Sequence, residues 1–294
     1  MTERVKITQE MVRIYDDYTH LTLDRRDFMQ KLSRLAGSTA AAAAIVPMLE
    51  ASKASAQIVP ENDPRLKTET ITWPGAEGVT MSGLLAMPAD ASGPLPTVMV
   101  IHENRGLNPH IQDVTRRMAL EGFVALGPDF LSPAGGTPEN EDQARDMIQA
   151  LDQAQTIANS VATVQFLKTH EAGNGKVGAI GFCWGGGMVN QTAVAAGADL
   201  AAGVVYYGQS PEAGQFGQIE ARMLLHYAGL DERINAGVPA YEEALKAAGV
   251  DYQIHMYEGA NHAFNNDTAE ARYNKEAADL SWSRTVEFLK AALA

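Results

Sequence analysis

A single cysteine lies in a glycine-rich stretch directly after a short apolar run. Residues 181–187 read Gly-Phe-Cys-Trp-Gly-Gly-Gly, and Cys183 is the one cysteine among the 294 residues. Glycines two positions before and after a side chain allow it to sit on a sharp turn between a strand and a helix, where larger neighbours would collide. The free N–H groups at the start of the following helix favour a thiolate. The pattern predicts a cysteine nucleophile, with a small buried cysteine in a tight turn as the alternative.

An acid and a histidine follow two later apolar runs. Asp231 comes after residues 223–227, and His262 comes after residues 250–257. An imidazole draws the proton from a thiol whose pKa is ordinarily near 8.5, and an ionised carboxylate holds that imidazole in the required tautomer. The order of nucleophile, acid and histidine is that of α/β-hydrolases. Taken singly, Asp231 is typical of a turn or helix cap and His262 of a hydrogen-bonded loop, and Glu232 is a competing acid.

The loop at residues 102–106 supplies the remaining part of such a site. It reads His-Glu-Asn-Arg-Gly and follows the apolar run 98–101. In this arrangement one backbone N–H of an oxyanion hole comes from that loop and the other from the residue after the nucleophile. We therefore expect Asn104 and Trp184 to be the two donors.

The elements needed to position these residues alternate along the chain. Apolar runs predict strands, and 3.6-residue periodicity predicts helices between them. Such alternation indicates a mostly parallel sheet covered by helices on both faces, with its site at the carboxyl ends of the strands. The predicted strands are 69–73, 81–87, 98–102, 123–127, 176–180, 203–207, 223–227 and 250–257, and the predicted helices are 111–121, 139–170, 188–196, 238–248 and 270–293.

The first 56 residues differ from the rest and resemble a twin-arginine export signal. Arg25 and Arg26 are followed by Phe28, an alanine-rich run covers residues 35–48, and the small residues 54–56 form a cleavage pattern. The apolar run is too short for a stable membrane span. We expect residues 1–56 to engage the export machinery and residues 57–294 to form one domain, periplasmic or secreted and without membrane insertion after processing. The alternative is a cytoplasmic protein whose N-terminal helix is retained and packs on the domain.

The composition of the chain argues against several classes of binding partner and cofactor. A net charge of −13 argues against nucleic acid and anionic membranes. One cysteine excludes an intramolecular disulfide and a cysteine-based zinc cluster, and His102, His226 and His255 lack metal-ligand spacing. We expect no metal and no cofactor, and the sequence makes no prediction about oligomeric state.

Taken together, the cysteine turn, the loop at 102–106, Asp231 and residues 260–264 (Ala-Asn-His-Ala-Phe) resemble the dienelactone hydrolase family, also called carboxymethylenebutenolidases. The resemblance covers roughly residues 69–292 and implies an α/β-hydrolase fold with a triad of Cys183, His262 and Asp231. It also implies that Glu103 lies beside the thiol and pairs with the resting cysteine. An ion pair between Glu103 and Arg105 is the alternative.

The chain differs from that family at the positions whose side chains hold the carboxylate of the substrate in known members. Known members use two arginines, but neither residues 129–133 nor residues 262–266 contain one. Arg105, Arg145 and Arg272 are possible replacements, Arg105 first. The sequence therefore predicts hydrolysis of a small ester or lactone through a cysteinyl acyl-enzyme, without a preference for acidic substrates. The alternatives are a broad carboxylesterase, and a non-catalytic or redox-sensing protein built around Cys183.

Overall fold

An eight-stranded sheet forms the centre of the molecule in the computed structural model, which describes residues 6–50, 57–211 and 214–294. The strand order is β1-β2-β4-β3-β5-β6-β7-β8. β1 and β2 pair antiparallel, as do β2 and β4, whereas every other neighbouring pair is parallel. The strands are β1 (Leu66–Pro74), β2 (Thr80–Pro88), β3 (Leu95–Ile101), β4 (Val124–Asp129), β5 (Gly173–Phe182), β6 (Ala202–Tyr206), β7 (Arg222–Ala228) and β8 (Tyr252–Tyr257).

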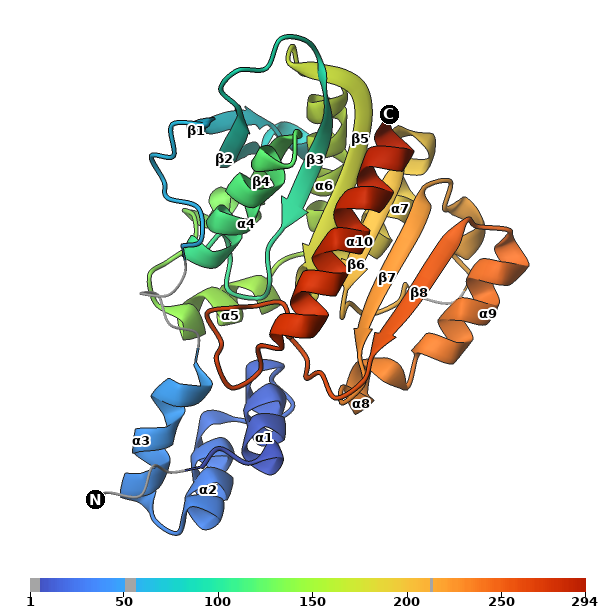
Figure 1. Ribbon diagram of the computed structural model, residues 1–294. Helices are drawn as coiled ribbons and strands as arrows, with labels where there is room; N and C mark the ends of the chain where they lie inside the picture. The colour runs from blue at the N-terminus through green and yellow to red at the C-terminus, as the bar shows by residue number, and fades with distance from the viewer. Residues whose placement is uncertain (1–5, 51–56, 212–213) are drawn as a thin grey trace.

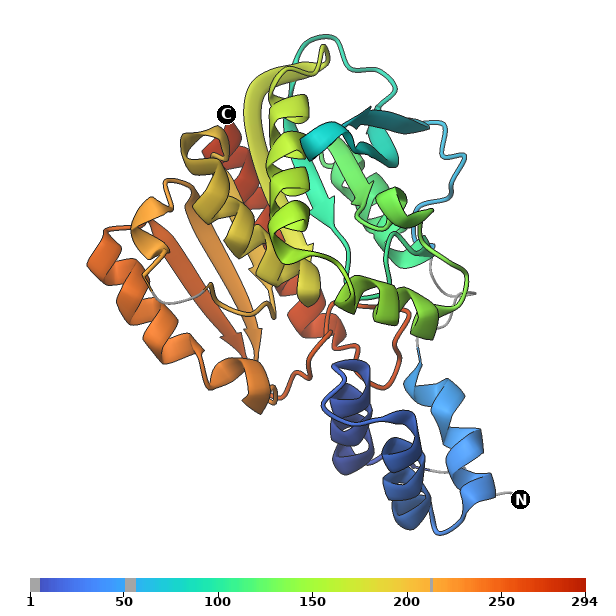
Figure 2. The ribbon, with the colours of Figure 1, turned by 180° about the vertical axis from the view of Figure 1, so that it is seen from behind.

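Helices cover both faces of this sheet, as the sequence predicted (Figures 1 and 2). Successive side chains of a strand point to opposite faces. In β3, Val98 and Val100 therefore join the core under α4 and α10, whereas Met99 and Ile101 join the core under α6, α7 and α9. The helices after β3 are α4 (Pro109–Leu120), α5 (Glu141–Gln149), α6 (Gln153–Lys168), α7 (Trp184–Ala196), α8 (Glu232–Asn235), α9 (Val238–Ala248) and α10 (Lys275–Leu293). Short 3-10 turns lie between β1 and β2, at Ala76–Gly78, and after β3, at Ser132–Ala134, Gly197–Asp199 and Phe216–Gln218.

Caps explain where the helices differ from the sequence prediction. The region 139–170 forms two helices, because Asp152 caps α6 through its side chain while Asn140 caps α5. The last helix begins at Lys275 rather than at residue 270, since Asn274 caps it. Residues 173–175, expected only to break the preceding helix, already belong to β5.

Three helices form a separate bundle at the N-terminal end of the chain. They are α1 (Gln9–Thr19), α2 (Arg25–Ala36) and α3 (Thr39–Leu49), and the side chains of Thr8, Asp24 and Ser38 cap them. Isolated helices of this length are marginal in water, so packing must stabilise them. Here they share a buried cluster that includes Tyr15, Phe28 and Leu32. We call residues 6–50 the N-terminal segment.

The N-terminal segment lies beneath the carboxyl ends of the strands, as both views show (Figures 1 and 2). Within the described ranges, no single helix is long and apolar enough to cross a membrane, whereas α2 and α3 pass that test together as a pair bent by 108°. The predicted cleavage pattern at residues 54–56 lies outside the described residues.

Candidate active site

Cys183 occupies the sharp turn between β5 and α7. Its backbone has φ 55° and ψ −114°, a conformation that non-glycine residues rarely adopt. A Cβ on Gly181 would lie 2.1 Å from the carbonyl oxygen of Gly185, and one on Gly185 would lie 2.4 Å from that of His102. The two glycines are therefore required by close backbone contacts on both sides of the turn. The thiol is only 9% exposed.

His262 and Asp231 lie together beside this turn. Asp231 follows β7 and His262 follows β8, and Nδ1 of His262 donates to Oδ2 of Asp231 over 2.5 Å. Both side chains are buried. Burial opposes a charged imidazole, but the Asp231 and Asp16 carboxylates outweigh it and raise the pKa of His262 well above its usual value. The competing acid Glu232 is exposed and begins α8, so the structure brings Asp231 to the histidine.

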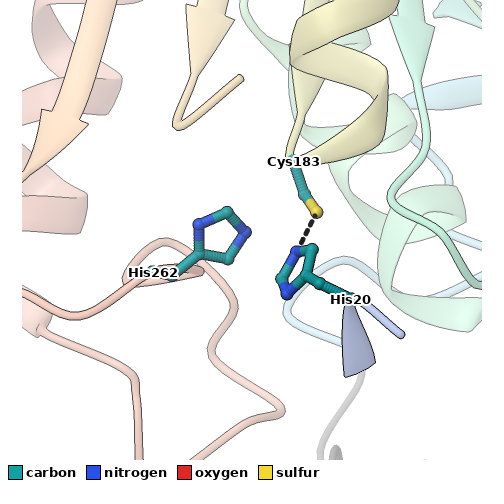
Figure 3. Close-up of side chains that lie close together, drawn as sticks. All are labelled: His20, Cys183 and His262. Carbon is teal, nitrogen blue, oxygen red and sulfur yellow. Dashed lines mark hydrogen bonds between the residues drawn. The ribbon is translucent and has the colours of Figure 1, made fainter. Parts of the chain in front are cut away.

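Nε2 of His262 has no hydrogen-bond partner among the described residues, although the atom is buried. It faces the region of the cysteine, and one ring nitrogen of His262 lies within 4.8 Å of Sγ. Figure 3 shows both side chains converging on the same space. The structure thus brings together the three residues that the sequence singled out.

A second histidine, which the sequence analysis did not consider, makes the hydrogen bond to the sulfur. Nε2 of His20 lies 3.2 Å from Sγ of Cys183, and the rings of His20 and His262 meet edge to face with centroids 4.7 Å apart (Figure 3). His20 caps the carboxyl end of α1. Its Nδ1 lies 2.8 Å from the carbonyl oxygen of Asp16 and 3.4 Å from the Asp16 carboxylate.

The hydrogen-bond partners of His20 define where the proton shared by His20 and Cys183 can lie. A carbonyl oxygen only accepts, so Nδ1 of His20 must carry a hydrogen. Nε2 then either accepts the S–H of Cys183 or donates to its thiolate. Burial alone raises the pKa of Cys183, but the charges of His20 and His262 and the hydrogen bond from His20 lower it to about 6. Burial likewise lowers the pKa of His20, whereas the Cys183 thiolate and Asp16 raise it to about 9. The balance favours a thiolate beside an imidazolium at neutral pH.

A cavity of about 590 Å³ opens beside the sulfur. Asn104 and Trp184, the predicted oxyanion donors, both line it together with Cys183 and His262. Trp184 is the first residue of α7, so its N–H has no partner within the helix. The side chain of Asn104 is held by the N-terminal segment, because its Nδ2 donates to the carbonyl oxygen of Thr19 over 2.8 Å.

Glu103 is buried near Cys183 but hydrogen-bonds elsewhere. Both residues line a second cavity of about 30 Å³. Oε2 of Glu103 accepts from Nδ2 of Asn266 over 2.8 Å, and among the described residues the sulfur is hydrogen-bonded by His20 instead. The structure therefore differs from the expected resting pair of Glu103 and Cys183.

The arginines occupy positions that the sequence could not assign. Arg105 does not line the larger cavity but lines the smaller one beside Cys183, and its guanidinium donates to the carbonyl oxygen of Glu141. Its role as a substrate ligand stays a prediction. Arg272 lines only the smaller cavity. Arg145 and Arg233 do line the larger one, but Arg145 pairs with two aspartates of α5 and Arg233 lies 3.7 Å from Asp16.

In the part of the chain that the structure describes, two sets of side chains have ligand-type atoms close enough to share an ion by distance alone. They are His20 with Cys183 and His262, and Asp16 with Asp231 and His262, with the atoms of each set within 4.8 Å of one another. Hydrogen bonds join two of these residues in each set, His20 with Cys183 and His262 with Asp231, so both sets belong to the site around the sulfur.

The sequence contained one signal for His20. Residues 8–20 combine a threonine cap, buried residues on one helix face (Val12, Tyr15) and an acid four residues before the histidine. These features indicate a stable amphipathic helix. What they lack is any indication of the partner, which lies 163 residues away.

Comparisons with known proteins identify the family to which this chain is similar. The model of the dienelactone hydrolase family matches residues 81–293. A Saccharolobus solfataricus protein named "Putative carboxymethylenebutenolidase" is 31% identical, over 73% of this chain and 95% of its own. The Pseudomonas putida carboxymethylenebutenolidase is 28% identical, over 76% and 96%. The crystal structure of a "Putative Dienelactone Hydrolase" from Klebsiella pneumoniae is 28% identical and superposes with a TM-score of 0.69, over 76% of this chain and 98% of that one.

Proposed function

The chain belongs to the dienelactone hydrolase family of hydrolytic enzymes, and on that premise we propose that it cleaves a small ester or lactone through Cys183, His262 and Asp231. The observation that carries the proposal is the buried pair of His262 and Asp231, whose free Nε2 lies beside a cysteine on a strained turn. We assign these atoms to proton transfer rather than to metal binding.

In the first half of the reaction, the Cys183 thiolate attacks the substrate carbonyl carbon. A carbon–sulfur bond forms, and the carbonyl electron pair moves onto oxygen. The N–H groups of Asn104 and Trp184 stabilise this oxyanion, a contribution worth about 3 kcal/mol per donor in comparable hydrolases. When the oxyanion collapses, the carbon–oxygen bond to the leaving group breaks and His262 supplies the proton that the leaving oxygen takes.

In the second half, His262 removes a proton from a water molecule that attacks the thioester. The acid product leaves and the thiolate is regenerated. Asp231 keeps Nδ1 of His262 protonated throughout, so that Nε2 alone exchanges the proton.

A burst experiment tests this assignment. With an activated aryl ester, the wild-type enzyme should release one equivalent of phenol rapidly, and intact-mass analysis should show one acyl group on Cys183. Cys183→Ala should lose the adduct and about 10³-fold or more of kcat. Steady turnover by Cys183→Ala would refute the nucleophile. A panel of lactones and simple esters then separates a lactone hydrolase from a broad carboxylesterase, and peroxide-sensitive binding without turnover would favour a redox sensor.

We further propose that residues 1–56 direct export, with the mature enzyme beginning near Gln57. The support is the order of the twin arginines, the alanine-rich run and the small residues 54–56. Sequencing the N-terminus of protein recovered from periplasmic and cytoplasmic fractions of the native cells tests this. Full-length chain confined to the cytoplasm would refute it.

A further inference from the structure

Two imidazole–carboxylate pairs converge on one sulfur atom. His262 and Asp231 lie in loops of the sheet domain, whereas His20 and Asp16 lie on one turn of α1. The second pair falls outside residues 81–293, where the family match lies. The family match therefore does not account for the presence of His20 and Asp16 at the sulfur.

The N-terminal segment is held over the site by contacts to α5 and to the loop after β3. Tyr18 and Arg25 both donate to Oδ2 of Asp142, over 2.9 and 2.7 Å. Arg145 lies over the ring of Tyr18 at 4.8 Å from its centroid. With the bond from Asn104 to Thr19, these contacts surround His20 and fix its approach to the sulfur.

The segment also leaves the nucleophile accessible from one side. Thr19, His20 and Leu21 line the 590 Å³ cavity, and Cys183, Trp184 and His262 line it as well. A substrate entering this cavity would contact both the sheet domain and the turn after α1. The segment thus forms a wall of the cavity rather than filling it.

We propose that the N-terminal segment, for as long as it stays attached to the chain, completes the active site, with His20, oriented by Asp16, holding Sγ of Cys183 for attack and the turn Thr19–Leu21 bounding the substrate cavity. Cleavage near Gln57 would remove this segment and leave the triad of Cys183, His262 and Asp231. The proposal deepens the proposed function, on which it rests for the role of Cys183 as nucleophile. It gives the two histidines different roles. His20 positions the sulfur and favours its thiolate form, and Nε2 of His262 remains free to exchange protons with the leaving group and with water.

The charges around the sulfur support this division. His20 and His262 face it directly, Asp16 and Asp231 lie behind the two rings, and Glu103 and Arg272 line the small cavity beside it. The positive charges of both rings lower the pKa of Cys183 against the effect of burial. Removal of His20 leaves one of the two neighbouring positive charges and no hydrogen bond to the sulfur.

The test compares four full-length proteins: wild type, His20→Ala, His20→Gln and Lys31→Ala. Gln retains an N–H donor but carries no charge, and Lys31 is exposed on α2. The rate of alkylation by iodoacetamide, measured from pH 5 to 10, reports the thiolate directly and needs no turnover. The kcat and KM for a neutral aryl ester are measured on the same preparations, with thermal unfolding to establish that each variant folds.

In His20→Ala we expect the thiol pKa to rise by at least one unit, so that alkylation at pH 5 falls about tenfold, because below both pKa values one unit is a tenfold change in thiolate fraction. Higher intrinsic nucleophilicity of the weaker acid offsets part of this loss. His20→Gln should lose most of the same rate, kcat/KM at pH 5 should fall about tenfold in both, and Lys31→Ala should match wild type.

Two results would overturn the proposal. One is an alkylation profile in His20→Ala and His20→Gln that superposes on wild type. The other is a tenfold or greater rise in turnover when His20 is replaced, which would make the segment an inhibitor. Retained turnover by Cys183→Ala refutes the proposed function instead, and the alkylation profile separates that failure from this one.

Discussion

The sheet domain and the N-terminal segment reach the same sulfur by different structural means. His262 and Asp231 come from loops after adjacent parallel strands, β8 and β7, and their hydrogen bond measures 2.5 Å. His20 and Asp16 are four residues apart on one helix, and their side-chain nitrogen and oxygen lie 3.4 Å apart. One pair depends on the whole sheet and the other on a single helical turn.

The two pairs therefore differ in how firmly the fold holds them in place. The loops carrying His262 and Asp231 cannot move apart without disturbing the paired strands. The N-terminal segment has its own buried cluster and meets the domain through contacts such as the pair of Arg25 and Asp142, in which Arg25 is 69% exposed. Exposed ion pairs of this kind contribute about 1 kcal/mol or less. The segment is therefore the part of the site that can be removed or displaced while the triad stays intact.

The largest expected effect distinguishes the two carboxylates. Asp231→Asn should lower kcat for an aryl ester by about 10³-fold, because the amide stabilises the wrong tautomer of His262 and cannot balance its charge. Asp16→Asn should cost about tenfold or less, because His20 keeps its bond to the Asp16 carbonyl. Glu232→Gln, on the exposed start of α8, is the matched control and should match wild type. Equal losses in the two aspartate variants would contradict the division of roles.

The triad residues could be predicted from the sequence, whereas the contact of His20 with Cys183 could not, for a physical reason. The turn at Cys183 is coded locally by Gly181 and Gly185, and the order of Asp231 and His262 follows from the parallel sheet. The contact of His20 depends on where an independent helical bundle packs, which no local spacing encodes. Arg25 illustrates the same difficulty, because the residue that indicates an export signal also pairs with Asp142 of α5.

The next effect concerns the charge of the substrate. Both arginines that line the cavity already have carboxylate neighbours: Arg145 within the sheet domain, and Arg233 across the boundary at Asp16. A substrate carboxylate would have to displace these, in a protein of net charge −13. We expect the methyl ester of a dienelactone carboxylate to exceed the free acid in kcat/KM by about tenfold, the value of roughly one charge-assisted bond.

Asp16→Asn provides the control for that comparison. It releases Arg233 from its neighbour, so the ratio of the two substrates should shift towards the free acid. Any general loss from the disturbed His20 affects both substrates alike and cancels in the ratio. A tenfold preference of the wild-type enzyme for the free acid would show that an arginine in the cavity does bind a carboxylate.

The smallest expected effect is on docking of the N-terminal segment as pH changes. The pKa of Cys183 is lowered to about 6, so its charge stabilises the docked state at neutral and higher pH and is lost as pH falls through about 6. The pKa of His20 is raised to about 9, so its charge contributes fully at low pH and is lost as pH rises through about 9. Both charges are present together between about pH 6 and 9.

Hydrogen-exchange protection factors of the α1 amides measure this docking. An ion pair worth about 1 kcal/mol changes an opening equilibrium about fivefold. We therefore expect protection in wild type to be about fivefold higher at pH 7.5 than at pH 5 or 10, relative to Cys183→Ser, which retains a hydrogen-bonding group of similar size but no charge. His262, Asp231, Asp16, Glu103 and Arg272 remain in both proteins, so their titration cancels. If both proteins gave the same pH profile, the charge of Cys183 would not contribute to docking of the N-terminal segment. Packing and contacts such as those to Asp142 would then hold the segment, even where His20 still controls the reactivity of the sulfur.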